Sequence, residues 1–373
     1  MVAISMIRSF SGSSPVISMS IHTRWAVTLP PSSRVSGRGP RRAVPRHYPR
    51  RARGGQRDPA RYARPAGSAN IPCPANLETG LSRFPPPLVE AETLAALLAE
   101  QPAAPAGPLR LIHVAEAAAF EQAHLPGALL VEPRALLDGR PPAAGRLPDA
   151  GRLNALFGSL GHTPDCYYVV YDDEGGGWAG RFVWTLDVIG HHRWSYLNGG
   201  LIAWHEAGLP LEAGPAAAPP ASQVAVAIAP DAPVAEVDDV LAAIDDPGRI
   251  IWDVRSAEEY RGERSGSRRA GHVPTARHLD WMRLKDPTRG LRLTEGLPEL
   301  LAAHGIDGRL PVITHCQSHH RSGLSYLVGR LLGFRDIRAF HGSWGEWGNR
   351  DDTPVVTGDA PGEPADGRTG RAP

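Results

Sequence analysis

The chain has 373 residues, 42% of them hydrophobic, so it is long enough for two ordinary domains with apolar cores. No apolar stretch approaches the ~18 residues that a membrane-spanning helix needs, and three scattered cysteines exclude a disulfide framework or a zinc module. The formal net charge of +1 hides an uneven distribution, because the first 70 residues carry 13 Arg and one Asp. The remaining 27 basic and 38 acidic residues make the rest of the chain acidic. We therefore expect no nucleic-acid partner and no membrane partner.

Residues 1–85 are rich in Arg, Pro, Gly and Ser and have little hydrophobic periodicity. Such a segment cannot bury enough apolar surface to offset its ordering entropy, so we predict a disordered tail. Three other interpretations stay open: an organelle transit peptide, a non-specific arm for nucleic acid or anionic membrane, and translated sequence upstream of the true start. We predict a cytoplasmic protein, with the transit peptide as the alternative. Residues 358–373 are likewise predicted to be disordered.

Residues 86–212 alternate between helical and strand patterns. The predicted elements are a helix at Leu94–Leu98, a strand at 109–114, a helix at 153–160, a strand at 167–171, a Gly-rich loop, a helix around 182–189 and a strand at 194–197. The apolar run at 167–171 is typical of a strand buried on both faces, as in parallel sheets. The pattern predicts an α/β domain with a mostly parallel sheet and helices on both faces.

The same order recurs in residues 233–357, after an Ala- and Pro-rich linker at 213–232. The predicted elements are a helix at 237–244, a strand at 250–254, helices around 297–301 and 324–331, and a strand at 311–315. Gly190 precedes Gly199 by nine residues and Gly333 precedes Gly342 by nine, and in each copy a Trp follows five residues later. These spacings predict a tandem duplication.

The residue after one strand differs between the copies: Asp172 in the first and Cys316 in the second. In open parallel sheets, ligands bind beyond the carboxyl ends of the strands. There a cysteine meets loop N–H groups and the start of the next helix, and both favour the thiolate. We therefore predict that Cys316 is a nucleophile. An inert core position suits Cys166 better, and Cys73 falls in the predicted tail.

The loop after Cys316 supplies candidate ligands for an anionic substrate. These candidates are Gln317, Ser318, His319, His320 and Arg321, together with Arg181 and Trp178 from the matching loop of the first copy. A metal site of Cys316, His319 and His320 is not expected, because consecutive histidines point in different directions and no fourth ligand is suitably spaced.

These residues resemble the rhodanese family of sulfurtransferases in its tandem form. The segment from Phe120 to Ala128, with His124-Leu125-Pro126-Gly127, matches the early signature of the family, and Phe340–Trp347 matches its late one apart from His341. The resemblance covers about residues 86–356. It implies two rhodanese-like α/β domains, an inactive one at 86–212 and a catalytic one at 233–357.

The resemblance implies a thiosulfate sulfurtransferase that needs no metal and no other cofactor. Cys316 would take the outer sulfur of thiosulfate, or of another sulfane-sulfur donor, as a persulfide. Cyanide, a thiol or a protein would then accept that sulfur. Asp253 and Arg255 look like the Asp-x-Arg pair of the family, which braces the domain near the site rather than reacting.

Two departures from the family leave the donor open. Thiosulfate-preferring members usually have basic residues directly after the cysteine and mercaptopyruvate-preferring members have Gly-Ser-Gly, and this loop matches neither. Glu259 stands where the family usually has a substrate-binding Arg.

Two alternatives to the sulfurtransferase are retained. One is a related phosphatase or arsenate reductase, although those enzymes use Cys-x5-Arg and this chain has Cys-x4-Arg. The other is a sulfur-carrier or interaction module.

Overall fold

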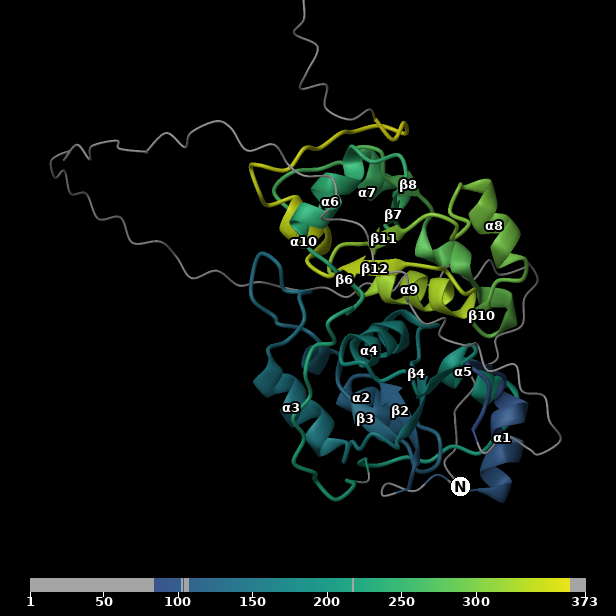
Figure 1. The fold of residues 1–373 in the computed structure, drawn as a ribbon. Coiled ribbons are helices and arrows are strands. Elements are labelled where there is room, and N and C mark those ends of the chain that lie inside the picture. Colours follow the sequence, from purple (N-terminus) through teal and green to yellow (C-terminus); the bar gives the residue numbers. More distant parts are fainter. Residues whose placement is uncertain (1–83, 102, 104–106, 217, 363–373) are drawn as a thin grey trace, which may run out of the picture. The chain divides into compact units, whose positions relative to one another are not determined.

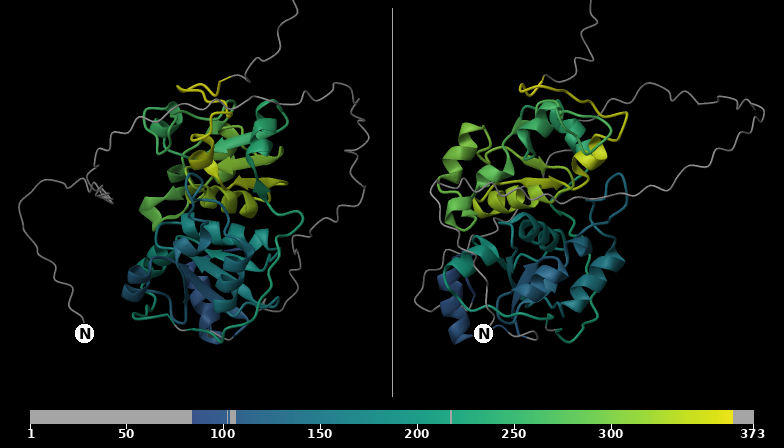
Figure 2. Two further views of the ribbon diagram at one scale, coloured as in Figure 1. Left: turned by 90° about the vertical axis from the view of Figure 1, so that its left-hand side faces the viewer. Right: turned by 180° about the vertical axis from the view of Figure 1, so that it is seen from behind.

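The computed structural model describes residues 84–101, 103, 107–216 and 218–362, and the predicted tail before residue 84 lies outside these ranges. Two five-stranded parallel sheets follow one another along the described chain (Figure 1). The fold class predicted from the sequence is therefore confirmed. Figure 2 shows the elements of the first sheet in blue and teal and those of the second in green and yellow.

The first sheet has the strand order β1-β5-β4-β2-β3 and is parallel throughout. Its elements are β1 (Leu88–Val89), α1 (Ala91–Glu100), β2 (Leu109–Val114), α2 (Ala117–Gln122), β3 (Leu129–Val131), η2 (Pro133–Leu136), α3 (Ala150–Ser159), β4 (Tyr167–Tyr171), α4 (Gly177–Val188), β5 (Trp194–Leu197) and α5 (Gly200–Glu206). Ile112 and Val170 pack toward α3 and α4, while Leu111 and Val169 pack toward α1 and α5. Both faces are covered, so the strands are buried and mostly apolar.

The second sheet repeats this order as β6-β12-β11-β7-β8. Its elements are β6 (Val234–Ala235), α6 (Val237–Ile244), β7 (Ile250–Asp253), α7 (Ala257–Arg261), β8 (Arg277–His278), α8 (Leu297–Ala303), β11 (Val312–His315), α9 (Arg321–Leu331), β12 (Ile337–Phe340) and α10 (Ser343–Trp347). Between β8 and α8 lie η3 (Trp281–Leu284), β9 (Lys285–Asp286), η4 (Pro287–Arg289) and β10 (Arg292–Leu293). The matching strand orders agree with the predicted duplication.

The His-x-Pro loops of the two copies also share one local geometry. His124 stacks on Phe120 with ring centroids 3.9 Å apart and its Nδ1 contacts the Phe120 carbonyl oxygen at 2.8 Å. His272 stacks on Tyr260 at 3.6 Å and its Nδ1 contacts the Tyr260 carbonyl oxygen at 2.7 Å. In each domain the histidine fastens the loop to the preceding helix.

The predicted disordered segments extend too far into the chain at both ends. Phe84 stacks on Tyr167 with ring centroids 4.5 Å apart, so the residues directly before β1 already pack on the first sheet. The N–H of Thr275 donates to the carbonyl oxygen of Pro361 at 2.6 Å, and His272 Nε2 contacts the Ala360 carbonyl oxygen at 3.1 Å. The second domain therefore continues beyond residue 357, because its His272 loop takes up the later backbone.

The two domains meet where α4 packs against α9. Phe182 and Val183 of α4 belong to the same buried apolar cluster as Leu324 and Leu327 of α9. One hydrophobic core thus runs through both domains, as it does in a single packed unit.

Glycines at the crossing allow this close approach. A methyl group added at Gly180 would overlap the carbonyl oxygen of Gly323, and one added at Gly323 would overlap the carbonyl oxygen of Gly177. Other contacts across the boundary are polar: the N–H of Leu147 donates to His341 Nδ1 at 2.9 Å, and Arg146 lies 3.4 Å from Glu346.

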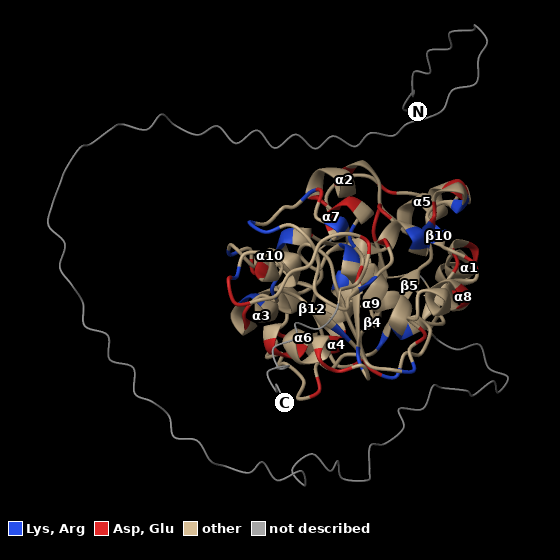
Figure 3. Cartoon of the chain, turned by 90° about the horizontal axis from the view of Figure 1, so that it is seen from above, with Lys and Arg blue, Asp and Glu red and all other residues tan. Residues whose placement is uncertain are grey.

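Basic and acidic residues are interspersed along the described part of the chain (Figure 3). None of the helices in the described part of the chain is both long and apolar enough to span a bilayer.

The glycine contact predicts that Gly180→Ala destabilises the protein by about 1–3 kcal/mol, because an overpacked core must shift its backbone. Thermal unfolding followed by circular dichroism would measure the change. Gly151→Ala in α3 is the control, since its methyl group would meet only the side chain of Asp149. Equal unfolding temperatures for the two variants would contradict the steric argument.

Candidate active site

Cys316 is the first residue after β11, the middle strand of the second sheet, and lies at the carboxyl edge of that sheet. Residues 316–320 form a tight loop that leads directly into α9. Cys316 is buried, with 1% of its surface exposed. The thiol therefore lies where the sequence placed it, at the edge at which parallel sheets bind ligands.

Ser343 stabilises the conformation of this loop through hydrogen bonds to its backbone. Its Oγ accepts hydrogen bonds from the N–H groups of Cys316 (3.4 Å) and His319 (3.1 Å) and donates to the carbonyl oxygen of Phe340 (2.9 Å). The N–H of Trp344 donates to the Cys316 carbonyl oxygen at 3.0 Å. Both Ser343 and His319 have positive φ values, 52° and 55°, so the surrounding structure imposes the loop conformation.

The loop favours the thiolate form of Cys316. Burial alone would raise the pKa of the thiol, but the charge of Arg321 and hydrogen bonds from the Ser322 hydroxyl and from the N–H groups of Ser322 and Ser318 hold it below the ordinary range. Hydrogen bonds and a cation directed at the sulfur are the environment of a reactive cysteine. The same N–H groups would stabilise an anion carried on that sulfur.

Arg321 is engaged by a carboxylate. Its two terminal nitrogens lie 2.6 Å and 2.9 Å from the two oxygens of Glu259, a bidentate pair. Although burial alone raises the pKa of Glu259, the bonds to Arg321 keep it below its usual range. The cation predicted to bind the substrate is thus partly neutralised by Glu259.

The other loop residues face different surroundings. Gln317 Nε2 donates to Ser267 Oγ at 3.1 Å. The Ser318 carbonyl lies so close to Gly145 of the first domain that a methyl group there would overlap it. His319 is fully buried, its Nδ1 is 2.8 Å from Ser322 Oγ, and burial lowers its pKa far below the usual value.

His320 is the loop residue with the most exposed ring, and the first domain holds it. Its Nε2 pairs with the carboxylate of Glu174, which lies in the loop between β4 and α4. Its ring stacks on Trp178 with centroids 4.2 Å apart and is tilted against Trp281 at 5.7 Å. Trp178 therefore contacts the second domain, through His320.

Arg181 is fully buried and bound to its own domain. Its terminal nitrogens donate to the carbonyl oxygens of Gly145 (2.8 Å) and Leu136 (2.6 Å), while its Nε has no hydrogen-bond partner among the described residues. Burial lowers the pKa of Arg181 to about 9, and the charge of Cys316 opposes this effect. Arg181 thus anchors the segment that touches Ser318.

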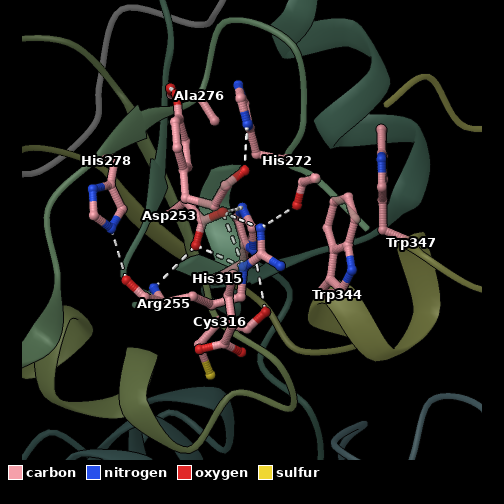
Figure 4. Close-up of polar contacts among 12 residues, drawn as sticks. Asp253, Arg255, His272, Ala276, His278, His315, Cys316, Trp344 and Trp347 are labelled. Carbon is pink, nitrogen blue, oxygen red and sulfur yellow. Dashed lines mark hydrogen bonds and ion pairs between the residues drawn. The ribbon is translucent and has the colours of Figure 1, made fainter. Parts of the chain in front are cut away.

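Asp253 and Arg255 form a fully buried ion pair behind Cys316, with Arg255 Nη2 2.6 Å from Asp253 Oδ2. The guanidinium lies 4.3 Å from the ring centroid of Trp344. Burial alone would raise the pKa of Asp253, but Arg255 and His315 hold it below its usual range. Figure 4 shows the sulfur of Cys316 directed away from this network.

The first domain has an equivalent loop with a carboxylate in place of the thiol. Asp172 follows β4 and accepts hydrogen bonds from the N–H groups of Glu174, Gly175, Gly176 and Ala179, at 2.8–3.2 Å. Burial and the nearby Glu174 raise the pKa of Asp172 to about 6, despite these bonds. The carboxylate occupies the ring of donors that faces the sulfur in the second domain.

Several site residues were missed by the sequence reasoning. Four of them contact the loop: Ser343, Ser322, Glu174 and Trp281. The fifth, Lys285, contacts Glu174 and Trp281. Ser343 lies inside the late signature that was quoted, so its position carried a signal. The described residues contain no cluster of three or more metal-ligating side chains.

Comparisons with known proteins agree with this architecture. A rhodanese-like domain model matches residues 90–207 and 236–350. The chain is 46% identical over 247 residues to a thiosulfate sulfurtransferase of Azotobacter vinelandii and 45% identical to one of Pseudomonas aeruginosa, covering 66% of this chain and 90% of each relative. The crystal structure of YnjE superposes with a TM-score of 0.66 at 21% identity, covering 74% of this chain and 69% of that one.

The hydrogen bond from Ser322 predicts that Ser322→Ala raises the pKa of Cys316 and slows its alkylation at neutral pH several-fold, because the thiolate loses a donor. The pH dependence of the alkylation rate with iodoacetamide would measure this. Ser325→Ala is the control, since Ser325 is buried in the same helix but bonds Thr314. Equal effects of the two variants would show that Ser322 acts only through packing.

Proposed function

The chain belongs to the rhodanese family, and from this we propose that it is a sulfurtransferase that moves a sulfane sulfur from thiosulfate to a thiophilic acceptor through a persulfide on Cys316. The observation that supports this most directly is the position of Cys316 in a tight loop of N–H donors, with a thiol pKa held below its ordinary range. The very similar relatives named thiosulfate sulfurtransferase support the same activity.

In the first half-reaction the Cys316 thiolate attacks the outer sulfur of thiosulfate. A new S–S bond forms, the S–S bond of the donor breaks, and sulfite leaves with the electron pair. The product is a Cys316 persulfide whose terminal sulfur carries the negative charge. The N–H groups of Ser318 and Ser322 lie where they stabilise such an anion.

In the second half-reaction a nucleophile attacks the terminal sulfur and regenerates the thiolate. Cyanide, a low-molecular-weight thiol or a cysteine of another protein has the required chemistry. Because the two substrates never need to be bound together, ping-pong kinetics are expected. No step requires a metal or an organic cofactor.

The residues proposed to contact the donor are those of the loop. Ser318 and Arg321 act on the sulfur, and Gln317 and His320 belong to the same loop. His319 and Arg181 are buried and would act by shaping the loop. Asp253 and Arg255 brace the strand behind it. A related donor such as 3-mercaptopyruvate would meet the same groups.

A phosphatase or arsenate reductase activity is less well supported. The loop is one residue shorter than Cys-x5-Arg, and Arg321 is turned to Glu259 rather than left free for a tetrahedral oxyanion. A sulfur-carrier or interaction module remains the non-enzymatic alternative, because it would also use a persulfide.

We further propose that the protein acts in the cytoplasm. The reaction requires Cys316 as a free thiol, and a reducing compartment maintains that state.

Replacing the nucleophile tests the assignment directly. Cys316→Ser is expected to abolish transfer of sulfur from thiosulfate to cyanide and to prevent the addition of one sulfur atom seen by intact-protein mass spectrometry. Cys166→Ser is the matched control, since Cys166 is a buried cysteine of the first domain, and it should retain both. Cyanide turnover by the Cys316→Ser protein would overturn the proposal.

The Glu259–Arg321 pair predicts that Glu259→Gln lowers the KM for thiosulfate about three- to tenfold, because the charge of Arg321 becomes available to the anion. Glutamine keeps the shape of the helix cap at Ser256. Glu258→Gln removes an exposed neighbouring carboxylate and should leave the KM unchanged. A raised KM for Glu259→Gln would mean that the carboxylate orients Arg321 toward the donor, and an unchanged KM would mean that Arg321 does not act on the donor.

A further inference from the structure

A group of side chains from both domains surrounds the ring of His320. Glu174 and Trp178 come from the first domain, and Trp281, Lys285 and His320 come from the second; we call these five residues the Glu174 cluster. The first domain lacks a nucleophile, yet through this group it contacts a residue four positions after Cys316. The persulfide mechanism itself assigns no role to the first domain.

The carboxylate of Glu174 is held in place and held ionised. Lys285 Nζ donates to the backbone carbonyl oxygen of Glu174 and lies 3.6 Å from the ring centroid of Trp281, which ties the loop of the first domain to η3 of the second. Burial alone would raise the pKa of Glu174, but the hydrogen bond and charge of His320 and the charge of Lys285 keep it below its usual value.

The carboxylate also fixes which nitrogen of His320 is free. A carboxylate only accepts, so Nε2 carries the proton that it donates to Glu174. The stacked Trp178 ring fixes the plane of the imidazole. Nδ1 has no hydrogen-bond partner among the described residues, and 24% of the His320 side chain is exposed. The second nitrogen is thus left for a ligand.

The contact between Glu174 and His320 depends on the absence of a side chain at Gly177. A methyl group at this first residue of α4 would overlap the Glu174 carboxylate and lie 2.7 Å from His320 Nε2. Only glycine at this position lets the two side chains meet, so the geometry can be broken without removing a charge.

We propose that Glu174 is a positioning residue for sulfur transfer, which holds His320 so that its Nδ1, on taking up a proton together with an anionic donor, donates a hydrogen bond to the oxygen atoms of that donor. This proposal rests on the proposed function and assigns a role in it to the first domain. While the Cys316 thiolate attacks the outer sulfur, the negative charge that stays on the departing sulfite is stabilised by His320. The imidazole keeps its protons throughout, so the step needs no further reactant.

The test separates donor binding from turnover. In a Cys316→Ser background, Glu174→Gln is expected to raise the Kd for thiosulfate about fivefold to tenfold by calorimetry, since a charge-assisted contact is lost. His320→Gln should have a similar effect, and the double variant should be no weaker than the single ones, because both remove one interaction. Asp173→Asn, an exposed carboxylate beside Glu174, is the matched control and should bind normally.

Steady-state kinetics of the Cys316-containing protein provide a second measurement. Glu174→Gln and Gly177→Ala should impair thiosulfate, a dianion, several-fold more than a monoanionic thiosulfonate with the same sulfane sulfur. A merely structural role would impair both donors equally, and that result would overturn the proposal.

Failure of the proposal is distinguishable from failure of the proposed function. If the unmodified protein forms no persulfide with thiosulfate, the proposed function is wrong. If it forms the persulfide but Glu174→Gln leaves the binding and the kinetics of thiosulfate unchanged, only the role of Glu174 is wrong.

Discussion

The close crossing of α4 and α9 is the constraint on which the rest of the site depends. Gly180 and Gly323 let the two helices touch through their backbones, and each helix begins directly after the loop at the carboxyl edge of its own sheet. Because the N-terminal turns of α4 and α9 pack against each other, the loops that precede the two helices face each other. The contacts of Glu174 with His320 and of Gly145 with Ser318 follow from that geometry. Separating the domains would therefore expose one core and dismantle one wall of the site.

The equivalent loops of the two domains both direct N–H groups at a negative charge, but the group that carries the charge differs. In the first domain four N–H groups converge on a carboxylate that belongs to the chain, so Asp172 permanently fills the space for an anion. In the second domain the side chain of Cys316 is shorter than that of Asp172 and leaves room for one more atom. The substrate supplies the sulfur that carries the negative charge there. The residues behind the two loops also differ. His113 lies opposite Tyr171 across β2 and β4, where Asp253 lies opposite His315 across β7 and β11.

Local periodicity was enough to predict the fold class and the central strands of each sheet. The bounds of β4, β5 and α6 agree with the expected ones because those segments are long enough to have a clear apolar pattern. The two-residue strands β1, β6 and β8 have no period and were missed, and the short strands β3 and β12 were missed as well. Position after a strand identified Cys316, whereas Glu174 and Lys285 are separated from it by long stretches of chain. Their meeting depends on how two domains pack, and spacing along one sequence carries no information about that. The sequence showed that Glu259 departs from the pattern of the family. Its pairing with Arg321 could be recognised only from the positions of both side chains.

The burial of Lys285 has a consequence for the surface of the whole protein. Lys285 is the only lysine in the sequence and is 5% exposed, so the outward-facing cations are guanidinium groups. Guanidinium groups stay protonated far above the pH at which lysine amines lose their charge. The surface charge is therefore almost constant through the alkaline range, where lysine-rich proteins become steadily more negative. An anionic donor approaching at alkaline pH meets the same long-range field as at neutrality, and amine-directed cross-linkers find no exposed lysine in the described domains.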